Sequence, residues 1–136
     1  MPVFSLLYVS RALVHGPEAE AAVADIVNVA RQRNGQLEVT GALLFTGAHF
    51  AQVLEGTHGA VKELMVSINR DPRHTEITVI QEGAVAEARF AQWTLAYSGP
   101  SNFIDRTVAR TLEEALVPGR LRGHRLLRLL KELTCG

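Results

Sequence analysis

The stretch VTGALLFTGAHFAQVLE, residues 39–55, holds two largely apolar runs on either side of the dipeptide Gly47-Ala48. Runs of this kind around a short turn are typical of two antiparallel strands. We therefore predict a β-hairpin, with strands at residues 39–46 and 49–55.

One residue of this hairpin does not fit an apolar strand. Gln52 alternates with Phe50 and Leu54, so its amide faces the same side of the strand as two core residues. Burying an amide without a hydrogen-bond partner costs about 1–3 kcal/mol. Gln52 therefore needs a partner, either the neighbouring backbone or something else.

The segments that flank the hairpin predict the fold. They are strands at residues 3–9, 75–85 and 89–98, a helix that starts at Pro17 and ends at Gly35, and a helix at residues 58–70 with Thr57 as its N-cap. The order β-α-β-β-α-β-β is the split βαβ pattern of ferredoxin-like α+β folds. We expect a mixed sheet with both of these helices on one face.

The other face of the sheet also needs a cover, because several predicted strands are apolar on both sides. Residues 104–115 and 119–134 predict two more helices, and the second carries a leucine stripe. We expect residues 1–98 to form the main domain and residues 99–136 a helical cap in the same compact unit.

Composition indicates an ordinary folded protein of 136 residues with 47% hydrophobic and 21% charged residues. Fourteen basic and fourteen acidic residues cancel, so nothing favours nucleic acid or a membrane as the partner. The single cysteine, Cys135, excludes a disulfide framework, and the N-terminus lacks the features of a secretion signal. No apolar run approaches the roughly 20 residues of a membrane span. We expect a cytoplasmic protein.

Two further polar residues fall near Gln52 in the predicted fold. Asn34 continues the apolar stripe of Val27 and Ala30 on the first helix, although a C-cap asparagine would explain it as well. Tyr8 ends the first strand, which in this topology lies beside the strand of Gln52. A phenol and two amides can therefore converge at the space between the two helices.

Several enzyme and metal chemistries find no support in the sequence. The five histidines show no metal-ligand spacing, and Ser10 and His15 have no acid at the spacing of a hydrolase triad. No G-x-G-x-x-G or Walker motif is present. We expect neither an enzyme nor a metal site.

Six motifs together resemble the BLUF family, the flavin-dependent sensors of blue light. They are LLYVSRA around Tyr8, ARQRN ending at Asn34, VTGALLF at 39–45, FAQVLEG at 50–56, DPRH at 71–74 and RFAQWTL at 89–95. Each is weak alone, but their joint spacing is specific and covers about Ser5 to Tyr97. The resemblance implies a ferredoxin-like domain that holds FAD non-covalently between its two helices, with FMN or riboflavin possible in preparations.

The resemblance also implies which residues contact the flavin. Asn34 matches the asparagine that hydrogen-bonds the pyrimidine edge of the ring, and Arg73 and His74 match residues that flank the ring. Arg31 matches a basic position of the same helix as Asn34 and is a weaker candidate.

Four residues match the light-sensing positions of the family. Gln52 matches the switching glutamine beside the flavin and Tyr8 the tyrosine that hydrogen-bonds it, while Trp93 matches a tryptophan of the last strand. Leu95 replaces a methionine usual two residues after that tryptophan. The resemblance thus implies that light drives electron and proton transfer from the tyrosine and rearranges the hydrogen bonds of the glutamine.

Two other positions depart from the family pattern, because Ala30 replaces a common serine and Ser67 a frequent basic residue. Together with Leu95, these departures leave an alternative function open, that of a flavin-free ferredoxin-like interaction module. A hydrolase of acylphosphatase type is a third possibility, supported only by analogy of fold. We expect a short stand-alone sensor that signals to a partner protein and forms homo-oligomers.

Overall fold

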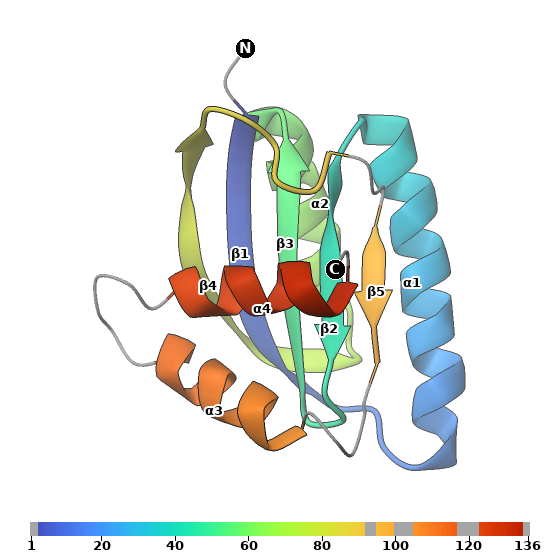
Figure 1. The fold of residues 1–136 in the computed structure, drawn as a ribbon. Helices are drawn as coiled ribbons and strands as arrows, with labels where there is room; N and C mark the ends of the chain where they lie inside the picture. The colour runs from blue at the N-terminus through green and yellow to red at the C-terminus, as the bar shows by residue number, and fades with distance from the viewer. Residues whose placement is uncertain (1–2, 92–94, 100–104, 117–122, 135–136) are drawn as a thin grey trace.

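The computed structural model describes residues 3–91, 95–99, 105–116 and 123–134. Strands and helices follow one another in the predicted order, and the two predicted C-terminal helices end the chain (Figure 1). The elements are β1 (Val3–Ala12), α1 (Pro17–Leu37), β2 (Thr40–Phe45), β3 (His49–Gly56), α2 (His58–Arg70), β4 (His74–Val85), β5 (Ala96–Ser98), α3 (Asp105–Leu116) and α4 (His124–Thr134). The ferredoxin-like α+β prediction is confirmed.

The five strands form one mixed sheet in the order β4-β1-β3-β2-β5. The pairs β1–β4, β1–β3 and β2–β3 are antiparallel, and β5 runs parallel to β2. The register of the central pair sets Tyr8 of β1 directly opposite Gln52 of β3. The topology therefore brings together two residues that are 44 positions apart in the chain.

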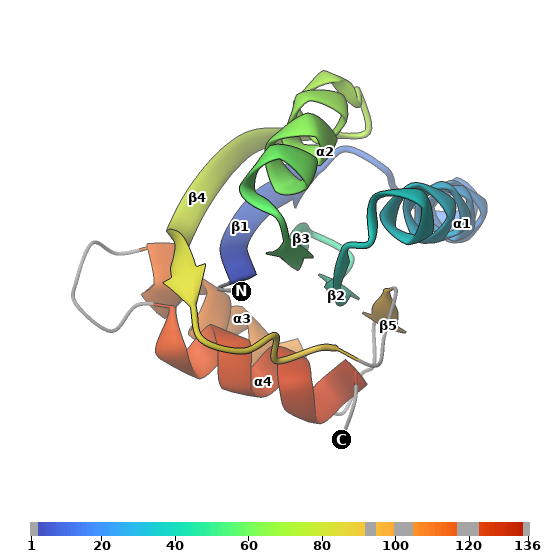
Figure 2. The ribbon, with the colours of Figure 1, turned by 90° about the horizontal axis from the view of Figure 1, so that it is seen from above.

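Helices cover both faces of this sheet (Figure 2). On one face, Leu6 and Leu54 pack against α2, and Leu43 and Phe50 pack against α1. On the opposite face, strand residues such as Val53 pack against buried leucines of α3 and α4. The apolar residues on both sides of the strands are thus explained, and the predicted cover by the C-terminal helices is confirmed.

The hairpin and α2 follow the sequence signals closely. The Thr57 hydroxyl accepts a hydrogen bond from the Ala60 amide at 3.2 Å, which makes it the N-cap of α2. Val61, Leu64 and Met65 form the buried side of this helix. The predicted bounds at 58 and 70 are confirmed.

The first helix ends later than predicted. Gly35 lies inside α1, and the left-handed residue that ends the helix is Glu38, with φ of 56° and ψ of 40°. The Glu38 amide donates to the carbonyls of Asn34 and Gly35. The interpretation of Asn34 as a C-cap is therefore wrong, since it lies a full turn inside the helix.

The last predicted strand is also shorter than expected. Of the described residues between 89 and 98, Ala96–Ser98 pair with β2, whereas Arg89 and Phe90 form a turn whose amides donate to the Glu55 side chain. Those amides are thereby withdrawn from any sheet ladder. At 21 residues α1 is the longest described helix, and none of the described helices has the length and apolarity to cross a bilayer.

Candidate functional site

A pocket opens between α1 and α2 above the centre of the sheet. It holds about 660 Å³ of space, part of which is open to solvent. Its lining combines apolar side chains with a few polar ones. The lining residues are Tyr8, Ile26, Val29, Ala30, Arg33, Asn34, Leu43, Phe50, Gln52, Leu64, Ser67, Ile68, Asp71, Arg73 and His74. An apolar cleft with few convergent polar groups is the usual form of a small-molecule site.

Tyr8 and Gln52 meet at the wall of this pocket. The Tyr8 hydroxyl donates a hydrogen bond to Gln52 Oε1, and both side chains are buried, with 3% and 4% exposure. Burial raises the pKa of the Tyr8 phenol far above its usual range, and the Asp71 carboxylate raises it further. Tyr8 therefore keeps its proton over the physiological pH range and offers it to one defined acceptor.

His74 is fixed by two contacts at the start of β4. Its Nε2 lies 2.7 Å from the Ile68 carbonyl, which can only accept, so Nε2 donates. Its Nδ1 lies 2.7 Å from the hydroxyl of the buried Ser10. The ring is thereby held edge-on to Tyr8 and Phe50, with ring centroids 6.2 and 6.0 Å away.

Arg73 ties α1 to the segment that follows α2. Its Nη1 lies 2.9 Å from Asp25 Oδ2 of α1, and its Nε and Nη2 donate to the Asp71 carboxylate at 2.9 and 2.7 Å. The hydrogen bonds from the Arg73 side chain lower the pKa of Asp71, outweighing its partial burial. Asp71 is therefore an anion that orients Arg73 at the pocket.

The residues predicted to contact a flavin fall into two groups. Asn34, Arg73 and His74 line the pocket together with Tyr8 and Gln52. Ala30 and Ser67, the two residues that differ from the family pattern, also line it. Arg31 is absent from the described lining, and its Nε instead donates to the Leu95 carbonyl at 3.2 Å. Arg33, which no sequence signal indicated as a contact, is part of the lining.

The two remaining predicted residues belong to the last strand region. Leu95 is 3% exposed and packs in the same apolar cluster as Leu43 and Phe50. Trp93 lies outside the described residues, so its prediction stays open. Within the described parts of the chain, no three His, Cys, Asp or Glu side chains are placed to hold a metal ion.

Glu55 is a structural residue near the end of β3. Its side chain is fully buried on the sheet face opposite the pocket, and Oε1 accepts from the Arg89 and Phe90 amides at 2.7 and 3.1 Å. Its Oε2 lies 3.7 Å from Arg89 Nε. A buried carboxylate that binds two backbone amides fixes the 87–91 turn to β3.

Replacing Glu55 by Ala is expected to destabilise the fold by about 2–4 kcal/mol, because two amides lose their acceptor and each orphaned donor costs about 1–3 kcal/mol. Urea unfolding followed by circular dichroism measures this loss. Glu55→Gln keeps an acceptor oxygen and is the matched control, with less than half of the loss. Equal losses for the two variants would contradict the assigned role.

Comparisons with known proteins agree with this geometry. The family described as "BLUF: Sensors of blue-light using FAD" matches residues 3–96. The photoactivated adenylate cyclase subunit beta of Euglena longa is 36% identical over 92 residues, which are 67% of this chain and 10% of that protein. The blue light- and temperature-regulated antirepressor BluF of Escherichia coli (strain K12) is 41% identical over 73 residues, which are 54% of this chain and 18% of that one. The chain thus spans less than a fifth of the length of these relatives.

Solved structures give the same result over nearly the whole chain. The dark-state structure of BlrB, a BLUF protein, is 33% identical, with 93% of each chain covered and a TM-score of 0.78. The ground state of BlsA has a TM-score of 0.80 with 94% of this chain and 87% of that chain covered; at 24% identity it supports the fold alone. Because the family match takes in well over half of the sequence, this chain belongs to the BLUF family, the sensors of blue light using FAD.

Proposed function

We propose that this chain is a blue-light photoreceptor that binds FAD non-covalently in the pocket between α1 and α2. The observation that carries the proposal is the buried hydrogen bond from Tyr8 to Gln52 Oε1 at the pocket wall. Packing alone gives no reason to bury a phenol and an amide beside an open apolar pocket, because polar groups cost free energy to desolvate. A ligand that uses both groups gives that reason.

The lining fits a flat ring that is apolar on its faces and polar at its edge. Ile26, Leu64 and Ile68 supply apolar contact, while the Asn34 amide offers both donors and an acceptor. We propose that Asn34, Arg73 and His74 hold the flavin, with Arg33 as an additional polar contact and Arg31 as a weaker candidate. FMN or riboflavin would use the same ring contacts in preparations that lack FAD.

When bound, the flavin supplies absorption of blue light and an electron acceptor in its excited state. Tyr8 is the proposed donor of an electron and a proton. Gln52 Oε1, which accepts the hydrogen bond from the Tyr8 hydroxyl, would take up that proton while the amide nitrogen gives one up toward the flavin, so that the amide stays neutral. The Gln52 amide carries donors on one branch and an acceptor on the other, so rotation or tautomerisation reverses its hydrogen bonds without adding charge. One new hydrogen bond worth about 1 kcal/mol shifts a two-state equilibrium about fivefold.

We propose that β5 and the C-terminal helices pass this change to a partner protein. Leu43 of β2 lies opposite Gln52 on one side and Tyr97 of β5 on the other. Leu43 therefore separates Gln52 from β5 across the sheet. Leu95 directly precedes β5, and its carbonyl accepts a hydrogen bond from the Arg31 side chain of α1. We further propose that residues 1–98 are the sensor, that residues 99–136 are a cap of the same unit, and that the chain signals by protein contact and homo-oligomers rather than by catalysis.

The test is the colour of the protein and its response to light. Protein purified with FAD is expected to be yellow, to show a small red shift of the flavin absorption after blue light, and to recover in the dark. Absorption spectra before illumination, after it and during recovery measure all three. A colourless protein that FAD cannot reconstitute would overturn the proposal and favour the flavin-free interaction module.

A further inference from the structure

A second, open groove lies on the opposite side of the molecule, between the 87–91 turn and α4. Its described lining holds four Lys and Arg residues and one acidic residue, Glu87. The residues are Glu87, Ala88, Arg89, Phe90, His124, Arg125, Leu127, Arg128 and Lys131. In a chain whose charges cancel overall, this is a local excess of positive charge.

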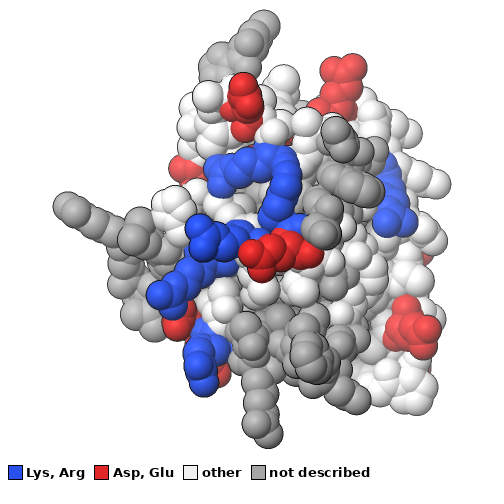
Figure 3. All heavy atoms as spheres, in the orientation of Figure 1, with Lys and Arg blue, Asp and Glu red and all other residues white. Residues whose placement is uncertain are grey.

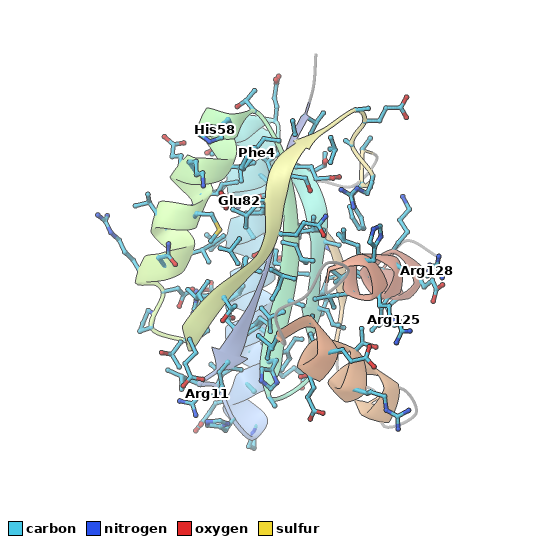
Figure 4. The ribbon with its side chains drawn as sticks, turned by 90° about the vertical axis from the view of Figure 1, so that its left-hand side faces the viewer. Phe4, Arg11, His58, Glu82, Arg125 and Arg128 are labelled. Atoms are coloured by element: carbon cyan, nitrogen blue, oxygen red, sulfur yellow. The ribbon has the colours of Figure 1, made fainter. Side chains whose placement is uncertain are left out.

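The cations form a row along α4. Arg125, Arg128 and Lys131 follow one another at steps of three residues, about 4.5 Å along the helix axis, and so share one side of it. Figure 4 shows Arg125 and Arg128 pointing away from the sheet into solvent. Figure 3 shows Lys and Arg side chains gathered across the middle of the face that α4 occupies in Figure 1.

Two of the four cations are engaged within the molecule, because Arg89 Nε lies 3.7 Å from Glu55 Oε2 and the Lys131 ammonium donates to the Arg89 carbonyl. The two arginines of α4 are less engaged. Arg125 pairs with Glu114 at 3.0 Å, but its side chain is 77% exposed, so the pair contributes little and can exchange partners. Arg128 is exposed and makes no salt bridge with another described residue. The row therefore presents guanidinium groups that can still form charge-assisted bonds with an external anion.

The opposite wall of the groove is rigid. Glu55 holds the amides of Arg89 and Phe90, and the Lys131 ammonium donates to the Arg89 carbonyl while lying 5.2 Å from the centre of the Phe90 ring. A wall fixed to β3 on one side and to α4 on the other is preformed for binding. Pre-organisation of this kind reduces the entropic cost of docking.

We propose that this groove docks an acidic helical segment of a partner protein, with Asp or Glu side chains three or four residues apart. Carboxylates at that spacing match the row on α4, and each can accept two parallel bonds from an arginine. Nucleic acid fits less well, because Phe90 is 1% exposed and the described lining offers no exposed Phe, Tyr or Trp for base stacking. The proposal requires neither flavin nor light.

The probe is a fluorescein-labelled peptide of about sixteen residues, long enough to form some helix, with Glu at every third or fourth position on an Ala background. Fluorescence anisotropy at low salt is expected to show saturable binding by the full chain. The same peptide with Gln in place of Glu is expected to bind at least tenfold more weakly, as is the Glu peptide at high salt.

Charge-reversal variants assign the binding to the groove. Arg128→Glu and Arg125→Glu are each expected to weaken binding about tenfold, whereas Arg70→Glu, the same change at an exposed site on α2, is expected to leave it unchanged. Thermal unfolding of each variant checks the fold. No saturable binding of the Glu peptide, equal effects of Arg128→Glu and Arg70→Glu, or tighter binding of a ten-nucleotide oligothymidylate would each overturn the proposal.

Discussion

Replacing Gln52 by Leu is expected to abolish the light-induced red shift while the flavin remains bound. Leucine has nearly the volume of glutamine, so the pocket wall keeps its shape, but it offers no acceptor to the Tyr8 hydroxyl. Without an amide, no hydrogen bond can reverse after illumination. The difference spectrum after blue light is expected to fall below one tenth of the wild-type amplitude.

The control is Gln36→Leu, which makes the same chemical change at an exposed position of α1. Its difference spectrum is expected to match that of the wild type. Flavin content per protein, read from the absorption of the denatured samples, separates a lost response from a lost cofactor. A wild-type shift in Gln52→Leu would rule out the proposed switch, even if the protein binds flavin normally.

The central part of this site could be predicted from sequence because it depends on regular structure. Alternation within the second hairpin strand assigned Gln52 to a core face, and the split βαβ order set the first strand beside it. Together these two inferences predict that Tyr8 lies beside Gln52. The register of β1 and β3 places the two residues opposite each other, and a hydrogen bond joins them. The first inference depends on periodicity within one strand, and the second depends on the order of the predicted elements. Both can be read from the sequence.

Residues that meet across loops or helix ends were not predictable in the same way. The pairing of Arg73 with Asp25 joins segments 48 positions apart and depends on how α1 lies against α2. The choice between Arg31 and Arg33 depends on the rotation of α1, and a shift of two residues moves a side chain about 200° around a helix. The resemblance implied Arg31 as a weaker candidate contact, which stays a prediction, and the described lining of the pocket includes Arg33.

The end of α1 shows how a strong local signal can mislead. Glycine is the commonest residue just after a helix, which is why Gly35 was expected to end it. Glycine also tolerates helical angles, and here the left-handed position falls on Glu38, whose amide closes the last turn. The contacts of Val39, which is 1% exposed, fix where the chain must leave the helix.

Replacing Gly41 by Ala is expected to have the largest effect on stability, at about 3 kcal/mol or more, because it overpacks the backbone of the central sheet. A Cβ at this position would lie 2.0 Å from the Val53 carbonyl oxygen and 3.0 Å from its carbon. Backbone atoms of β3 cannot rotate away as a side chain can, so β2 and β3 would have to separate. The midpoint of urea unfolding is expected to fall sharply.

Gly59→Ala is the matched control, since a Cβ there meets nothing within 4 Å and alanine favours a helix over glycine by up to about 1 kcal/mol. It is expected to raise the unfolding midpoint or leave it unchanged. If Gly41→Ala unfolded at the wild-type urea concentration, β2 and β3 would not approach as closely as described. Because β3 carries Gln52 between β1 and β2, a strand pair forced apart at Gly41 is also expected to weaken flavin binding, and the lost affinity should accompany the lost stability.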